Sequence, residues 1–243
     1  MKIRSSQDRG HANHGWLDSY HSFSFSNYYD PNWMGYSVLR VINEDVIAPS
    51  QGFGMHSHKD MEIITYILQG NLAHKDSLGN VEIIRQGHVQ RMTAGTGITH
   101  SEFNASETES VHLLQIWILP NQQNLKPSYE DKFFEDTQKQ DQWCLLASEK
   151  GENNSLIVHQ DMSLFSAKLS ERKTLDYALK DQSIKNRRSA YTQVASGSIE
   201  INQQVLNAGD AAMFDSAQTI TIVAIDNAEI LLFDLPVFDL PAV

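Results

Sequence analysis

Two short pairs of side chains in the first half of the chain carry donor atoms that bind transition metals. One residue separates His56 from His58, and the same spacing recurs at His100 and Glu102. Side chains two positions apart on a strand project from the same face, so each pair can present two donors together. Three imidazoles and one carboxylate suit divalent iron, manganese, nickel, copper, cobalt or zinc, and they do not suit an all-oxygen calcium or magnesium site.

Both pairs also have a simpler explanation. The chain has ten histidines, so either pair could arise by chance, and histidines commonly form plain hydrogen bonds at a surface or in a core. The two pairs nevertheless adjoin turns within one predicted group of strands. We therefore predict one metal site, whose ligands leave coordination positions open for a substrate, or for a substrate and dioxygen.

Other residues near the pairs are candidates for the same site. Glu62 follows His58 by four residues and is expected to share its face, as an alternative ligand, a general base or a hydrogen-bond partner that orients an imidazole. Four large side chains could line an apolar substrate pocket, although such residues are usually core: Phe53, Met55, Tyr66 and Met92. Seven histidines lack a partner at ligand spacing and are expected to form ordinary hydrogen bonds: His11, His14, His21, His74, His88, His112 and His159.

Short β-like runs must position these side chains. Turn residues separate the runs YSVLRVI, MEIITYIL, VEIIR and SVHLLQIWIL between about Tyr36 and Leu119, and similar runs return from about Ser155. This pattern favours an antiparallel sandwich or barrel. We predict a metal-binding barrel over residues 1–125, a connecting segment over 126–154 with one short helix opening near Pro127 and Ser128, and a second barrel over 155–243.

A faint internal repeat links the two halves. Aligning Gly70 with Gly197 pairs ILQGNL with VASGSI, and Gly87 and Gly209 then open the matching segments GHVQRM and GDAAMF. The glycine spacing is longer in the first copy, where DSLGN supplies a longer hairpin turn. The second copy has no His-x-His or His-x-Glu, so we expect it to hold no metal and to be structural.

Composition excludes several classes of protein. Thirty acidic and nineteen basic residues give a net charge of -11, which repels nucleic-acid backbones and anionic lipids. No run approaches the roughly 20 apolar residues that span a bilayer, and the N-terminus lacks the apolar stretch of a signal peptide. We expect a cytoplasmic protein that binds neither nucleic acid nor membrane.

Several blocks of sequence, in order, resemble the pirin family of the cupin superfamily, of the bacterial quercetin 2,3-dioxygenase type. The blocks are RGHANHGW, SFSFSNYYDP, LRVINED, GFGMHSHKDMEIITYILQG, HKDSLGN and MTAGTGITHSE. The resemblance implies an all-β bicupin with two facing antiparallel β-barrels of double-stranded β-helix or jelly-roll type and few short helices. It also implies one metal per chain held by His56, His58, His100 and Glu102, with Fe(II) as the expected ion, although the wider cupin pattern would place the carboxylate ligand at Glu62.

The resemblance further implies oxidative cleavage of flavonols such as quercetin with dioxygen and release of carbon monoxide. The ion would bind the 3-hydroxyl oxygen, and Glu102 or Glu62 would take its proton. The expected ligands are a small planar aromatic substrate and dioxygen. A second hypothesis is a non-enzymatic regulatory protein whose metal oxidation state controls binding to other proteins. We expect a monomer, because two facing barrels cover each other's open sheets.

Overall fold

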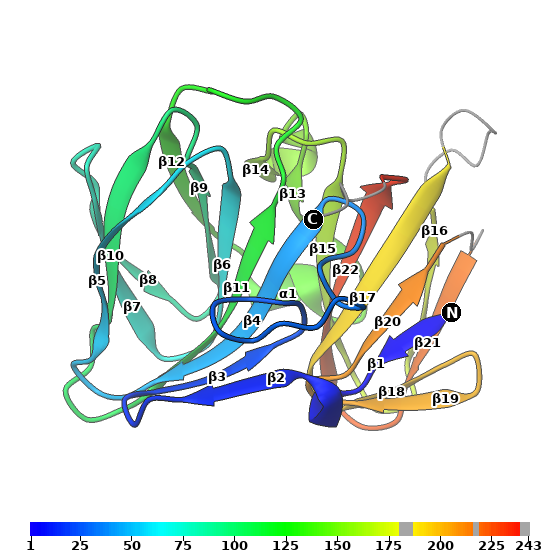
Figure 1. Ribbon diagram of the computed structural model, residues 1–243. Helices are drawn as coiled ribbons and strands as arrows, with labels where there is room; N and C mark the ends of the chain where they lie inside the picture. The colour runs from blue at the N-terminus through cyan, green and yellow to red at the C-terminus, as the bar shows by residue number, and fades with distance from the viewer. Residues whose placement is uncertain (180–186, 216–218, 239–243) are drawn as a thin grey trace.

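The computed structural model describes residues 1–179, 187–215 and 219–238, which form an almost entirely antiparallel β-structure (Figure 1). Helical structure in these ranges is limited to α1 (Asp136–Lys139) and two 3-10 turns, Ser6–Asp8 and Glu152–Asn154. None of the helices in the described ranges has the length and apolar character needed to cross a membrane.

The first half of the chain builds a large and a small sheet. The large sheet has seven strands in the order β12 (Ser128–Phe133), β9 (His88–Thr93), β6 (Glu62–Gln69), β11 (Val111–Ile118), β4 (Leu39–Ile47), β3 (Leu17–His21) and β2 (Gly10–Asn13). The small sheet has four strands in the order β5 (Gly52–His58), β10 (Ile98–Asn104), β7 (Asn71–Asp76) and β8 (Val81–Arg85).

The second half repeats this arrangement. Its large sheet runs β1 (Lys2–Arg4), β20 (Ala211–Phe214), β17 (Arg188–Ser196), β22 (Ala228–Pro236), β15 (Ser163–Leu169), β13 (Cys144–Ser148) and β14 (Leu156–Ile157). Its small sheet runs β16 (Thr174–Ala178), β21 (Thr219–Ala224), β18 (Ser198–Ile201) and β19 (Gln204–Asn207). The strands β6 to β9 thus occupy the same sheet positions as β17 to β20.

The predicted repeat is confirmed at its glycines. Gly70 and Gly197 have φ of +82° and +72°, and Gly87 and Gly209 have φ of +88° and +86°. These are left-handed turn conformations that glycine adopts without steric cost. The longer first copy reflects the longer hairpin of β7 and β8 compared with that of β18 and β19.

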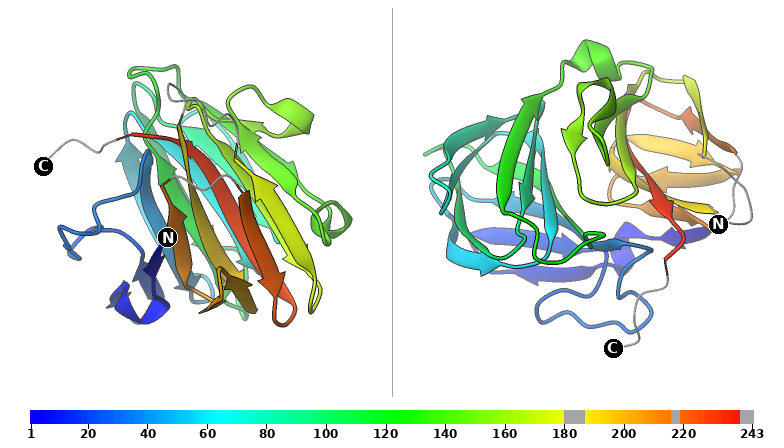
Figure 2. Two further views of the ribbon diagram at one scale, coloured as in Figure 1. Left: turned by 90° about the vertical axis from the view of Figure 1, so that its right-hand side faces the viewer. Right: turned by 90° about the horizontal axis from the view of Figure 1, so that it is seen from above.

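The four sheets stack as layers, with the two large sheets facing each other in the middle (Figures 1 and 2). Apolar side chains from both large sheets form one shared core, for example Ile64 and Leu114 from the first half with Leu164 and Leu231 from the second. The predicted all-β class with two facing units is confirmed. Each unit is a jelly-roll-like sandwich of two sheets and not a closed barrel.

The connecting segment differs from its prediction. Residues near Pro127 form strand β12 and no helix, because the edge of β9 offers backbone groups that pair with Ser128–Phe133. Strand β12 therefore extends the first large sheet, and β13 extends the second. The first strand, β1, also crosses to the second half and pairs with β20. The short helix of the segment lies at Asp136–Lys139 instead.

Candidate metal centre

Three histidines converge where β5 and β10 pair. His56 lies directly opposite His100 in the ladder, and His58 lies two positions along β5. The Nε2 atoms of His58 and His100 are 3.0 Å apart, and the ring centroids of His56 and His100 are 4.4 Å apart. One nitrogen from each ring lies within 4.8 Å of the others. The structure thus brings together the three histidines that the spacing had singled out.

The environment keeps His58 and His100 neutral. Burial, together with the neighbouring imidazoles, lowers the pKa of His58 to about 4 and that of His100 to about 3. His56 donates its Nδ1 hydrogen to the backbone oxygen of Gly54 at 2.8 Å, because a carbonyl can only accept. This bond leaves the lone pair on Nε2 of His56 available to a cation.

Glu102 is the carboxylate of this region, and two amides hold it. Its Oε2 accepts a hydrogen bond from Gln115 at 2.9 Å, and its Oε1 accepts one from Gln90 at 3.2 Å. Thr65 donates to the amide oxygen of Gln115 at 3.0 Å, which fixes that amide. A bulge between His100 and Glu102 re-aims the strand. The carboxylate forms a close group with His100 and His74, whereas the three histidines of β5 and β10 form the other group.

The donor set fits a divalent transition metal. Neutral imidazole nitrogens and a buried carboxylate are borderline ligands that such ions prefer. The Nδ1 atoms of His100 and His74 are buried without a hydrogen-bond partner among the described residues, which is a costly state for polar atoms. A cation bound within the group of His74, His100 and Glu102 would give such a nitrogen a partner.

Glu62 lies away from this cluster, contrary to expectation. Strand β5 ends at His58, and the following turn includes Asp60 with a positive φ of 48°, so the alternation that would align Glu62 with His58 is broken. The Glu62 carboxylate instead accepts hydrogen bonds from the Thr93 hydroxyl and the His159 backbone N–H, both at 3.2 Å. It therefore lies on the face of β6 opposite Thr65, turned toward the second half.

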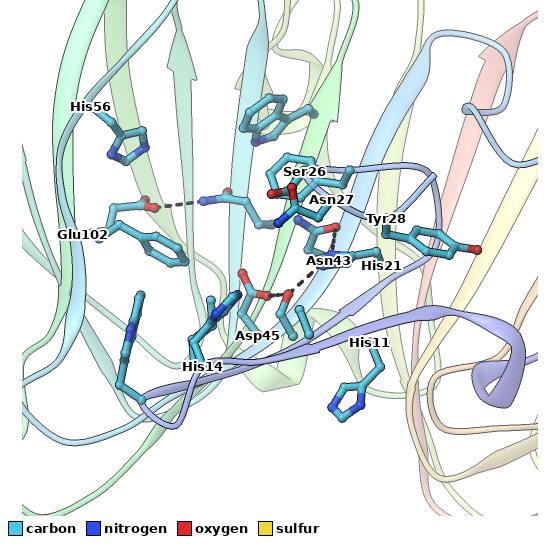
Figure 3. A pocket seen from close by; sticks show the side chains of 18 of the residues that line it. His11, His14, His21, Ser26, Asn27, Tyr28, Asn43, Asp45, His56 and Glu102 are labelled. Carbon is cyan, nitrogen blue, oxygen red and sulfur yellow. Dashed lines mark hydrogen bonds between the residues drawn. The ribbon is translucent and has the colours of Figure 1, made fainter. Parts of the chain in front are cut away.

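A cavity of about 640 Å³ opens beside the histidines (Figure 3). The small sheet contributes His56, His58 and Glu102 to its wall. Aromatic and polar side chains from the large sheet, the N-terminal strands and their loops line much of the rest, including Trp16, Phe25, Trp117, Ser19, His21, Asn43 and Asp45. Aromatic surface together with polar groups directed into the same cavity suits a small organic ligand that has polar groups of its own.

The four predicted pocket residues separate in the structure. Phe53 lines the cavity, whereas the other three are not among its lining residues. Met55 is 59% exposed, and Met92 packs in a small core cluster. Tyr66 lies between the two large sheets, where its hydroxyl donates to Glu229.

The remaining histidines fall into two groups. His11, His14 and His21 line the cavity, although no ligand spacing marked them. The others are not among the cavity's lining residues and pair with acidic side chains, as His11 also does with Asp18: His74 with Asp76, His88 with Asp131, His112 with Glu44 and His159 with Glu62. The one sequence feature that could have pointed to the first group is that His11 and His14 belong to the block RGHANHGW.

The second half has no equivalent donors at the matching positions. The sheet registers place Tyr177 where the first half has His56, and Ile220 where it has His100. By the same registers Ile222 takes the place of Glu102, and Ile201 takes that of His74. These four side chains belong to the apolar core that fills the second sandwich.

Comparison with known proteins matches both halves of the chain. A family model described as Pirin matches residues 2–118, and one described as the quercetinase C-terminal cupin domain matches residues 145–235. A protein of Escherichia coli (strain K12) named quercetin 2,3-dioxygenase is 48% identical, over 96% of this chain and 98% of that protein. A pirin-like protein of Caulobacter vibrioides is 42% identical, over 93% and 95%. The crystal structure of the bacterial pirin YhhW from Escherichia coli, in complex with nickel(II), has a TM-score of 0.90 at 46% identity and covers 97% of this chain and 98% of its own.

Proposed function

Because this chain belongs to the pirin family, as its sequence blocks indicated, we propose that it is a metal-dependent dioxygenase that cleaves flavonols such as quercetin and releases carbon monoxide. The observation that carries this proposal is the convergence of three imidazoles at one wall of a cavity whose lining includes several aromatic side chains. Flavonols are planar aromatic molecules, so such a cavity suits them.

His56, His58, His100 and Glu102 are the residues that would hold the metal. The nickel(II) complex of a pirin with 46% identity supports a divalent ion, and Fe(II) stays our prediction. When bound, the ion would act as a Lewis acid that lowers the pKa of a substrate hydroxyl, and it would supply open coordination positions.

The protein's own side chains hold the substrate and move its proton. Glu102 is fixed by Gln90 and Gln115, and it is the carboxylate that can accept the proton of the substrate 3-hydroxyl at this wall. The indole of Trp117 packs edge-on against His58 with ring centroids 4.9 Å apart, which fixes the imidazole and excludes water beside it. Glu62 has no part in this proposal, because it is turned away from the cavity.

The test uses reduced protein loaded with Fe(II), exposed to air and given quercetin. We expect bleaching of the flavonol absorbance together with release of carbon monoxide. The variants His56→Ala and His100→Ala should lose at least about a hundredfold in rate, because removing a ligand compromises metal binding. His88→Ala is the matched control, since His88 pairs with Asp131 outside the cavity and should keep full activity. Wild-type rates equal to those of His56→Ala would overturn the proposal.

The second hypothesis, a redox-responsive regulatory protein, gains no support from the site or from the relatives above. Binding to other proteins stays a prediction from sequence.

A further inference from the structure

Five polar side chains lie side by side across the large sheet of the first half. The registers of the neighbouring strands align Gln90, Thr65, Gln115, Asn43 and His21 in one row. Hydrogen bonds link both ends of the row: Gln90 donates to Thr65 at 3.1 Å, and His21 Nδ1 lies 2.9 Å from the Asn43 side-chain oxygen. Gln115, Asn43 and His21 line the cavity.

The same row in the second half is almost entirely apolar. The equivalent registers align Ala212, Thr192, Leu232, Phe165 and Leu145. The fold therefore does not require polar residues at these positions. Gln90, Thr65 and Gln115 serve to hold Glu102, whereas Asn43 and His21 make no bond to it and line the cavity. Buried polar groups cost free energy unless they are hydrogen-bonded, so this pair suits a cavity whose ligand has polar groups of its own.

Asp45 is the charged residue beside this row. It lies on β4 two residues after Asn43, on the same face, where the second half has Ala167. It is 4% exposed and lines the cavity. In the described part of the chain its carboxylate accepts a hydrogen bond from the Ser19 hydroxyl and forms no ion pair with a basic side chain. A buried carboxylate with so few partners has acceptor capacity left for a ligand.

Asp45 faces the metal centre from the other wall. His56, His58 and Glu102 belong to the small sheet, whereas Asp45 and Ser19 belong to the large sheet. Figure 3 shows Asp45 directed into the same cavity as Glu102, next to the Asn43 and His21 pair. A ligand held at the histidines can therefore present a second polar group to Asp45.

We propose that Asp45, positioned by Ser19, accepts a hydrogen bond from a second hydroxyl group of the substrate, so that the site selects planar aromatic substrates with hydroxyl groups beyond the one held at the metal. This inference rests on the proposed function and makes it more specific. Among flavonols, it favours those with hydroxylated rings over 3-hydroxyflavone, which has no other hydroxyl.

The test measures binding without turnover. Metal-loaded protein is titrated anaerobically with quercetin and, separately, with 3-hydroxyflavone, and the quenching of tryptophan fluorescence is followed. Trp16 and Trp117, two of the four tryptophans of the chain, line the cavity and respond to binding there. At pH 8, above the pKa of about 7 of Asp45, we expect wild-type protein to bind quercetin at least about tenfold more tightly than 3-hydroxyflavone, since a hydrogen bond to a charged group contributes that much to affinity.

Asp45→Ala introduces the residue type that the second half has at this position. It should weaken quercetin binding about tenfold and leave 3-hydroxyflavone binding unchanged. Asp45→Asn repeats the comparison at unchanged side-chain volume, in case the smaller residue perturbs the fold. Glu44→Gln is the matched control, because Glu44 lies on the opposite face of β4 and binds Arg9 and His112.

The outcomes separate the two proposals. An Asp45→Ala variant that keeps the wild-type preference for quercetin overturns the role of Asp45, while turnover by the wild type still supports the dioxygenase. Wild-type protein that binds neither flavonol overturns both.

Discussion

The carboxyl group of Asp45 is an unusual titrating group. Burial raises the pKa of this group most, the Ser19 hydrogen bond and His112 lower it, and the negative charges of Glu102 and Glu44 raise it, so that the pKa lies at about 7. The residue therefore changes its protonation state near neutral pH, whereas an aspartate in water is ionised throughout that range.

A consequence for stability follows from this shift. Between about pH 4 and pH 7 the folded state retains a proton that the unfolded chain has lost, so the contribution of Asp45 to stability falls as pH rises through that window. Asp45→Asn removes the dependence. We expect the variant to gain stability relative to wild type between pH 4 and pH 8, by up to about 4 kcal/mol. Urea unfolding of both proteins at pH 4 and at pH 8 measures this gain. A difference in the free energy of unfolding that is the same at the two pH values would contradict the raised pKa of Asp45.

At the scale of elements, the positions of the metal ligands depend on how closely β5 approaches β10. Gly52 lies opposite Phe103 in this pair, and a Cβ atom at Gly52 would overlap the backbone oxygen of Glu102. Gly54 lies two residues further along the same strand, and a Cβ atom there would meet open space. The two glycines therefore offer a matched comparison within one strand.

Gly52→Ala should separate the two strands at Glu102. We expect a loss of stability of about 1–3 kcal/mol, as for other overpacked sites, together with weaker metal binding. Gly54→Ala should change neither quantity measurably. Thermal unfolding and a metal titration on both variants provide the check, and equal metal affinities in the two would count against the importance of this close approach.

The sequence patterns predicted where the strands lie better than they predicted which way the side chains of each strand face. The repeated one-residue spacing located His56, His58 and His100 because ligand pairs on a strand need that spacing. Asn43 and Asp45 were missed because Asn43, Glu44 and Asp45 are three successive polar residues, and such a run does not tell which of them faces the interior. In the structure Ile42 packs against the second half, while Asn43 and Asp45 line the cavity. Glu62 was misplaced because a turn interrupted the count from His58.

For the whole molecule, the face between the two large sheets is the main shared core. Each large sheet has one face inside its own sandwich and the other face against the large sheet of the other half. Separating the two halves would therefore expose apolar surface on both of them. The two halves are therefore expected to unfold together.

Leu231 tests this coupling from the side that holds no metal ligands. It is fully buried in the shared core, and Leu231→Ala should lower the free energy of unfolding by about 2–5 kcal/mol. Because the halves are coupled, the temperature at which the metal is released on heating should fall by as much as the midpoint temperature of unfolding. Val205→Ala is the control, since Val205 is 56% exposed on β19. Metal release at the wild-type temperature from Leu231→Ala protein would show that the halves unfold separately.

Strand β1 has a consequence for how the protein is made. Lys2 pairs with Met213, so β1 is synthesised long before β20, the strand it pairs with. Until β20 has been made, β1 has no partner in this sheet, and contacts over such a separation in sequence form slowly. Closure of the second sheet is therefore expected to be a late event, which a nascent chain released before residue 211 could not complete.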